Sequence, residues 1–269
     1  MGLFMLLYNK ELLRSVIVMV YSNNFLDLKN QFIKGKIKTK YDKISCKDIE
    51  KKECFNQIVN LCFNGPMTPR LIAGLQVFRK KETNENAISN ILKDISNRLF
   101  NYMHEKKMYS KEEFDEYHNS ISLEFMRKFN DLIKGKQSSV SRKDKWTKKS
   151  VKCPVIMKGI NYGQAQKLIN LSFKWLYCMN GVEKYLQKFE FCHVALDRVT
   201  YSEGWYHKDV NKAAECFSWS KLELCQYKTV QLDFSHYITT SKYHTASNEV
   251  LFPFQAEFYA WDEYYSVIK

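Results

Sequence analysis

The stretch NYGQAQKLINLSFKWLYCM, residues 161–179, predicts a single helix with two different faces. One face is a stripe whose members recur at spacings of three and four, as in a helix that packs on a core. Asn161 before the helix and Asn180-Gly181 after it are typical of helix ends, because Asn accepts hydrogen bonds from first-turn amides and Gly tolerates a positive φ. The stripe consists of Ala165, Leu168, Ile169, Ser172, Leu176 and Met179.

The second face of this helix is polar. Gln166, Lys167, Asn170 and Lys174 are also spaced three and four apart, so they point away from the apolar stripe. Buried polar groups are costly unless they are paired, and a chain rich in aromatic residues has little reason to group them. We therefore expect this face to meet something polar, and we interpret it as part of a functional site.

The composition favours a mainly α fold, an irregular multi-helix domain with at most a few short strands. Only 9 Gly and 4 Pro occur in 269 residues, too few for the frequent turns of a β-sandwich or barrel. Capping-box patterns at Ser110–Glu113 and Ser220–Glu223 predict two helix starts. Helices are expected over residues 48–63, 71–78, 83–107, 110–134, 161–179, 182–192 and 224–238, and from Pro253 onward.

Positive charge is concentrated in one segment. Residues 134–158 contain nine Lys or Arg and one acid, a net charge of +8, whereas the whole chain carries +13. A dense run of like charge repels itself, and it is typical either of an arm that meets a polyanion or of a solvated, disordered linker. We expect an N-terminal helical part (1–133), a basic flexible segment (134–158) and a C-terminal helical part (159–269), together forming one cooperative domain.

Neither a cofactor nor a metal site is expected. The eight cysteines show no CxxC pair, so they are interpreted as reduced, buried residues of a cytoplasmic protein. Lys10, Glu11 and Arg14 interrupt the apolar N-terminus before the roughly twenty apolar residues that a membrane span requires. We predict no membrane partner and a buried terminal helix or strand.

Three residues are candidates for catalysis: Lys174, His193 and Asp197. His193 and Asp197 are four residues apart, so an imidazole and a carboxylate can share one face and act as acid and base. Asp197 can equally cap the next turn or pair with Arg198. His118 lies beside an apolar stripe and is interpreted as a core histidine.

The candidate nucleic-acid-binding residues come from the basic segment and from the polar face of the 161–179 helix. Lysines would contact phosphates, and Trp146 would stack on a base or dock the segment on the protein. Glu257, Asp262 and Glu263 make the last helix acidic, so it should lie away from a polyanion. The set is Arg142, Lys143, Lys145, Trp146, Lys148, Lys149, Lys152, Gln166, Lys167 and Asn170.

About forty residues resemble uncharacterised bacterial helical proteins. The shared pattern is G-x-A-Q-K-x-x-N, then K-aromatic-L-Y, then H-x-x-x-D, carried here by Gly163, Gln166, Lys167, Asn170, Lys174–Tyr177, His193 and Asp197. The proline of the H-x-P-x-D form is absent from HVALD, and the resemblance implies no activity. The separation of Lys174 from Asp197 is also similar to that of the catalytic Lys and Asp of helix-hairpin-helix DNA glycosylases, but their L-P-G-x-G turn is missing.

The leading hypothesis is therefore a nucleic-acid-binding helical protein of bacterial origin, of a phage-defence type. The first alternative is an enzyme acting on nucleic acid, a nuclease or glycosylase, that uses the Lys, Asn, His and Asp side chains. The second is a protein-interaction module, which the abundant aromatic residues favour. An enzyme must bring these side chains together in one pocket, whereas a binding module need not.

Overall fold

The computed structural model describes residues 41–64, 72, 75–143, 149–202, 205–211, 218–240 and 252–258. The chain divides into two compact units, Met1–Lys43 and Ile44–Lys269. Almost all of the described residues belong to the second unit, which includes residues on both sides of the basic segment. The N-terminal helix or strand predicted from the first residues lies outside the described part of the chain.

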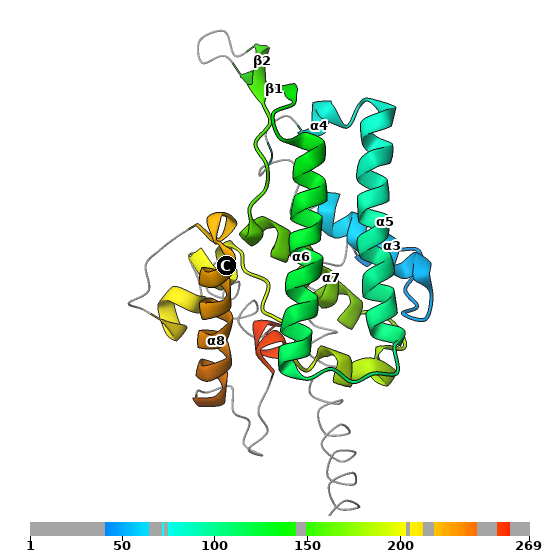
Figure 1. The fold of residues 1–269 in the computed structure, drawn as a ribbon, viewed down its shortest axis with the longest axis vertical. Coiled ribbons are helices and arrows are strands. Elements are labelled where there is room, and N and C mark those ends of the chain that lie inside the picture. Colours follow the sequence, from blue (N-terminus) through cyan, green and yellow to red (C-terminus); the bar gives the residue numbers. More distant parts are fainter. Residues whose placement is uncertain are drawn as a thin grey trace, which may run out of the picture. The chain divides into compact units, whose positions relative to one another are not determined.

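The fold is mainly α, as predicted, and its described part contains one two-stranded sheet. Two long antiparallel helices, α5 (Glu82–His104) and α6 (Lys111–Ile133), form a hairpin (Figure 1). The predicted capping box begins α6: Glu113 N–H donates to Ser110 Oγ at 3.2 Å, and Ser110 N–H donates to Glu113 Oε2 at 2.9 Å. This reciprocal pair satisfies two amides that have no partner inside the helix, which fixes the turn between α5 and α6.

The helix predicted from the opening stretch is α7 (Tyr162–Tyr177), and it is the centre of the fold. It packs against α6, against α3 (Lys52–Cys62), and against the turn Trp219–Lys221 that precedes α8 (Leu224–Thr240). All 16 of its residues are buried. A helix enclosed on all sides exposes no face, so the polar face of α7 lies inside the protein as its apolar stripe does.

Both ends of α7 are fixed by specific contacts. A Cβ atom on Gly163 would lie 2.1 Å from the Trp219 carbonyl oxygen, so only glycine permits the close approach of these two segments. Asn130 on α6 holds the entry to α7, since its side chain accepts from Ile160 N–H at 2.6 Å and donates to Ile160 O at 3.0 Å. Gly181, with φ of 78°, provides the left-handed exit that the sequence predicted.

Residues of the basic segment form a β-hairpin, which extends from the C-terminal end of α6 (Figure 1). Strand β1 (Gln137–Lys143) pairs antiparallel with β2 (Ser150–Ile156), with Gln137 opposite Ile156 and Lys143 opposite Ser150. Bonds from Gly135 N–H to Met157 O (3.0 Å) and from Met157 N–H to Lys136 O (2.9 Å) close its base. The expectation of a linker without regular structure is therefore wrong for the described residues of this segment.

The C-terminal half contains shorter elements than predicted. Residues Val182–Phe189 form a 3₁₀ helix instead of the expected α-helix. Helix α8 begins after Glu223, whose N–H donates to Gln226 Oε1 at 3.0 Å, so the capping box predicted at Ser220 does not start it. The helix predicted from Pro253 is present over the described residues 253–258. Earlier in the chain, α4 (Leu75–Phe78) lies within the helix expected over 71–78, of which residues 71, 73 and 74 are outside the described part.

Candidate functional site

The four residues of the polar face of α7 are all buried. Gln166 is 0% exposed, Asn170 1%, Lys174 3% and Lys167 8%. Polar groups removed from water must find partners inside the protein, and these residues do so in two separate clusters. This burial argues against direct contact of a nucleic acid with Gln166, Lys167 and Asn170.

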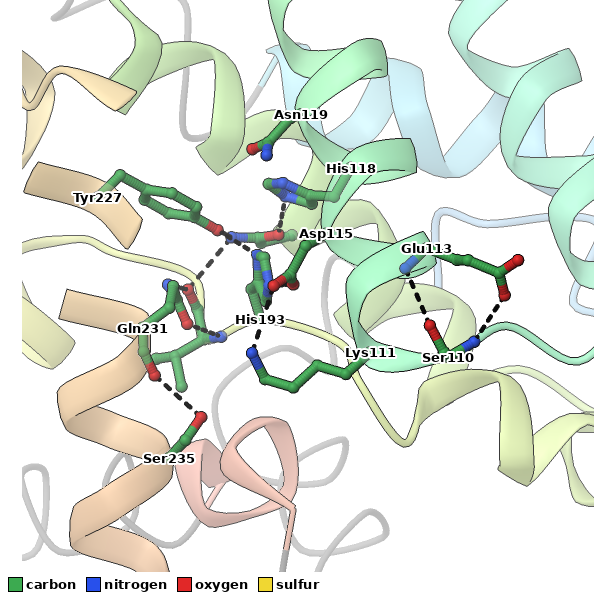
Figure 2. Close-up of polar contacts among 12 residues, drawn as sticks. Ser110, Lys111, Glu113, Asp115, His118, Asn119, His193, Tyr227, Gln231 and Ser235 are labelled. Atoms are coloured by element: carbon green, nitrogen blue, oxygen red, sulfur yellow. Dashed lines mark hydrogen bonds and ion pairs between the residues drawn. The ribbon is translucent and has the colours of Figure 1, made fainter. Parts of the chain in front are cut away.

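Asn170 is the centre of the first cluster (Figure 2). Its Oδ1 accepts from His118 Nε2 at 2.7 Å, and its amide nitrogen lies 2.9 Å from the Tyr227 hydroxyl and 2.8 Å from Gln166 Oε1. The same nitrogen lies 3.2 Å from the Val194 carbonyl. One amide therefore connects α6, α8 and the segment that contains His193.

His193 extends this cluster to the protein surface. Its Nε2 lies 2.8 Å from Asp115 Oδ1, and its Nδ1 lies 2.9 Å from the Tyr227 hydroxyl. A carboxylate only accepts, so Nε2 carries the proton, and Nδ1 then accepts from Tyr227. Both ring nitrogens are thus occupied, and the cluster runs from Asp115 through His193 and Tyr227, which Figure 2 labels, to Asn170.

Burial controls the protonation of this cluster. It lowers the pKa of His193, although the Asp115 carboxylate opposes the shift, and it lowers the pKa of His118 well below the usual range. Burial is the largest effect on Asp115 and raises its pKa, but His193 and Lys111 together outweigh it, so the net direction is downward. At neutral pH both imidazoles are neutral and the carboxylate is charged.

His118 is a core histidine, as predicted, but it also belongs to the polar cluster. Its ring lies 4.5 Å from the His193 ring, centroid to centroid, and stacks on Tyr227 at 5.6 Å. Because Nε2 donates to Asn170, Nδ1 is the acceptor, and it is buried without a hydrogen-bond partner among the described residues. Protonation of this ring would place an unpaired charge in the core.

The second cluster contains the other polar residues of α7. Lys174 Nζ lies 2.5 Å from Glu257 Oε1, while Glu257 Oε2 accepts from Ala195 N–H at 3.0 Å. Lys167 Nζ lies 3.7 Å from Asp197 Oδ2 and 4.2 Å from the centroid of the Trp219 ring. Burial lowers the pKa of Lys167 and raises that of Glu257. Glu257 is therefore a core residue, whereas Asp262 and Glu263 of the predicted acidic helix lie outside the described residues.

Asp197 caps a turn, as one of the alternatives predicted. Its Oδ1 accepts from Val199 N–H at 2.8 Å and from Thr200 N–H at 3.1 Å. His193 and Asp197 thus have different partners, although residues 193–197 run along α7 and join the two clusters. His193 belongs to the same cluster as Asn170, through the Tyr227 hydroxyl. Asp197 lies beside Lys167, and Lys174 forms an ion pair with Glu257.

A cavity of about 310 Å³ lies beside the first cluster. It is bordered by α6, residues 190–193, α8 and residues 252–253. Of the sequence-predicted site residues, only His193 lines it. Neither Lys174 nor Asp197 reaches this cavity, and each is engaged by other protein groups, so these contacts do not support their predicted catalytic roles.

The sequence analysis missed Asp115 and Tyr227. Asp115 lies three residues before His118 on α6, so the two share one side of that helix, but nothing local indicates that His193 joins them. Tyr227 is the fourth residue of α8 and had no signal that distinguishes it from the other aromatic residues. Only the packing of α6, α7 and α8 brings these side chains together.

The basic hairpin is the second candidate site. Opposite residues in an antiparallel pair project on the same side of the ribbon, and residues alternate between its two sides along each strand. One side therefore carries Ser139, Ser141 and Lys143 from β1 and Ser150 and Lys152 from β2. All of these except half-buried Ser139 are exposed, as is Lys149. The predicted contacts Lys145, Trp146 and Lys148, and the Arg142 side chain, lie outside the described part of the structure.

Comparison with known protein families, with characterised proteins and with solved structures gives no match. Among the described residues, no helix is long and apolar enough to cross a membrane. The site geometry alone therefore supports the functional proposals that follow.

Proposed function

We propose that this protein binds nucleic acid, double-stranded DNA in particular, through the exposed side of the β1–β2 hairpin. The observation that carries the proposal is the arrangement of hydroxyl and ammonium groups on one side of a ribbon with a strong positive charge. These groups belong to Ser139, Ser141, Lys143, Ser150 and Lys152.

The chemistry of this surface suits a sugar–phosphate backbone. Lysine ammonium groups neutralise phosphates and release condensed counterions, and serine hydroxyls donate hydrogen bonds to phosphate oxygens. On the other side of the ribbon Val140, Cys153 and Val155 are half-buried and Val151 is exposed, and β1 contacts α4. The side that carries the serines and lysines is the more exposed of the two.

The shape of the hairpin favours duplex DNA over duplex RNA. The major groove of B-DNA is about 12 Å wide and admits a two-stranded β-ribbon. The major groove of an A-form RNA helix is too deep and narrow for side chains to read. The buried residues of α7 are not part of the proposed surface.

Fluorescence anisotropy with labelled DNA and RNA duplexes of the same sequence tests the proposal. Reversing Lys143 and Lys152 to Glu should weaken DNA binding and reduce the slope of log K against log salt by about two, one for each lost phosphate contact. The matched control reverses Lys52 and Lys106, which are exposed lysines outside the hairpin. It changes the net charge equally and should retain most of the affinity.

The possible outcomes test the hairpin, the preference for DNA and the binding of nucleic acid separately. Equal losses in the two double variants would assign the binding to net charge and remove the hairpin from the proposal. Equal affinity for the RNA duplex would contradict the groove argument. Absence of binding to either duplex at low salt would overturn the proposed function and favour the protein-interaction module.

A further inference from the structure

The cavity beside His193 has one polar end and one apolar wall. Asp115 and Lys111 of α6 lie at the polar end, where Lys111 Nζ is 3.3 Å from Asp115 Oδ2. Phe191, Ile238 and Phe252 contribute to the apolar wall. A cavity of about 310 Å³ is at the lower limit of the usual range for small-molecule sites, about 300–1,000 Å³.

The charged groups of the lining are balanced. Lys111 and Lys228 contribute two positive charges, and Asp115 and Glu190 contribute two negative ones. A ligand with a single charge matches only one sign of this lining. A molecule that carries one ammonium and one carboxylate matches both signs.

The carboxylate of Asp115 is fixed in position by hydrogen bonds within the protein. His193 donates to its Oδ1, and His193 is itself fixed by the buried Tyr227 hydroxyl and Asn170. A carboxylate offers about four acceptor positions, of which His193 and Lys111 use two. The Asp115 side chain is 31% exposed, so the remaining positions are accessible from the cavity. Groups fixed before binding lose little freedom when a ligand arrives.

Gln231 also lines the cavity but is unavailable to a ligand. Its Oε1 accepts from Val194 N–H at 3.0 Å, and its Nε2 donates to Val194 O at 2.9 Å. Both ends of the amide are therefore used within the protein. Specific recognition rests on the charged side chains, with Asp115 as the fixed one.

We propose that this cavity binds a small zwitterion with an apolar side chain, an α-amino acid or the like, whose ammonium group contacts Asp115. Its carboxylate would contact Lys111 and Lys228, and its side chain would lie against the apolar wall. The site is independent of the hairpin: Asp115 is near the start of α6 and the hairpin follows its end, about 27 Å away along the helix axis. Figure 1 shows the hairpin beyond one end of α6, and the connection from α5 enters α6 at the other end.

Isothermal titration calorimetry with three matched probes tests this proposal. L-phenylalanine carries both charges, phenethylamine lacks the carboxylate, and 3-phenylpropionate lacks the ammonium. L-phenylalanine should bind at least about tenfold more tightly than either of the others, since each lacks one charged hydrogen-bonded contact. No binding of any probe at millimolar concentration, or equal binding of all three, would overturn the proposal.

Variants then assign the ammonium contact. Asp115→Asn keeps the shape of the side chain and should weaken phenylalanine and phenethylamine by about tenfold while leaving 3-phenylpropionate unaffected. The control is Asp131→Asn, which removes an exposed carboxylate from the other end of α6. A thermal melt establishes that Asp115→Asn is folded. Unchanged phenylalanine affinity in this folded variant would contradict the role of Asp115.

Discussion

Lys174 and Glu257 form an ion pair between the central helix and the 253–258 helix, with Nζ 2.5 Å from Oε1 and side chains only 3% and 1% exposed. The residues are separated by 83 positions in the sequence. Glu257 also accepts from Ala195 N–H, so its second oxygen is satisfied. The pair thus fixes the C-terminal helix and the 193–197 segment to α7.

Removing either partner of this pair should strongly destabilise the fold. Lys174→Met or Glu257→Gln should lower the free energy of unfolding by about 3–5 kcal/mol, because each leaves a buried group without its partner. The double variant should cost less than the sum of the two. Chemical denaturation measures all three.

The exposed pair of Lys184 and Glu50 is the control for that experiment. Its atoms are 2.9 Å apart, but the Lys184 side chain is 71% exposed. Lys184→Met should leave the free energy of unfolding nearly unchanged, because water screens the pair. If Lys174→Met were as mild as this control, the Lys174–Glu257 contact would not be formed in solution.

The amide of Asn170 should also contribute to stability, although less than the buried ion pair. Asn170→Ala leaves His118 and the Tyr227 hydroxyl each short of one buried partner, so it should lower the free energy of unfolding by about 1–3 kcal/mol. Asn101→Ala, on the exposed side of α5, is the matched control and should change it little. If Asn170→Ala and Asn101→Ala had the same free energy of unfolding, the polar cluster would not be built around Asn170.

The sequence predicted the features that depend on neighbours in the chain. The capping box of Ser110 and Glu113 involves residues three apart, and the positive φ of Gly181 is a property of one residue. Helix α7 was predicted from its spacing alone. Each of these signals is local, so no knowledge of the rest of the fold was required.

The sequence could not show what encloses α7. The polar face was expected to meet something polar, and nothing in the sequence shows that Lys174 meets Glu257 and Asn170 meets His118. Partners so distant in the chain follow only from tertiary packing. The hairpin was missed for a different reason: the run of lysines indicated a solvated segment, although the alternation in SVKCPVI is typical of a strand.

Gly163 provides a test of the packing between α7 and the turn before α8. In an unobstructed helix interior, Gly→Ala stabilises by about 1 kcal/mol. A Cβ here would lie 2.1 Å from Trp219 O, so Gly163→Ala should instead destabilise, by about 1–3 kcal/mol. The sign of the change in unfolding free energy decides the matter, since a stabilised variant would show that the two segments do not approach so closely.

Acid should destabilise the protein through its buried histidines. The folded-state pKa values of His118 and His193 lie below the usual 6.5, because burial disfavours the charged imidazole. The unfolded chain therefore binds protons first as the pH falls through about 6.5, so the unfolding free energy is constant above that pH and declines below it. Asp115 opposes the shift at His193 and Lys111 supports it, whereas His118 is itself unfavourably close to His193.

Denaturant melts at a series of pH values across this range measure how the free energy of unfolding changes with pH. The two variants to compare are His118→Gln and His236→Asn, of which His236 is exposed. The decline should become shallower in His118→Gln and persist in His236→Asn, and an unchanged slope in both would contradict the neutral state of His118 in the folded protein.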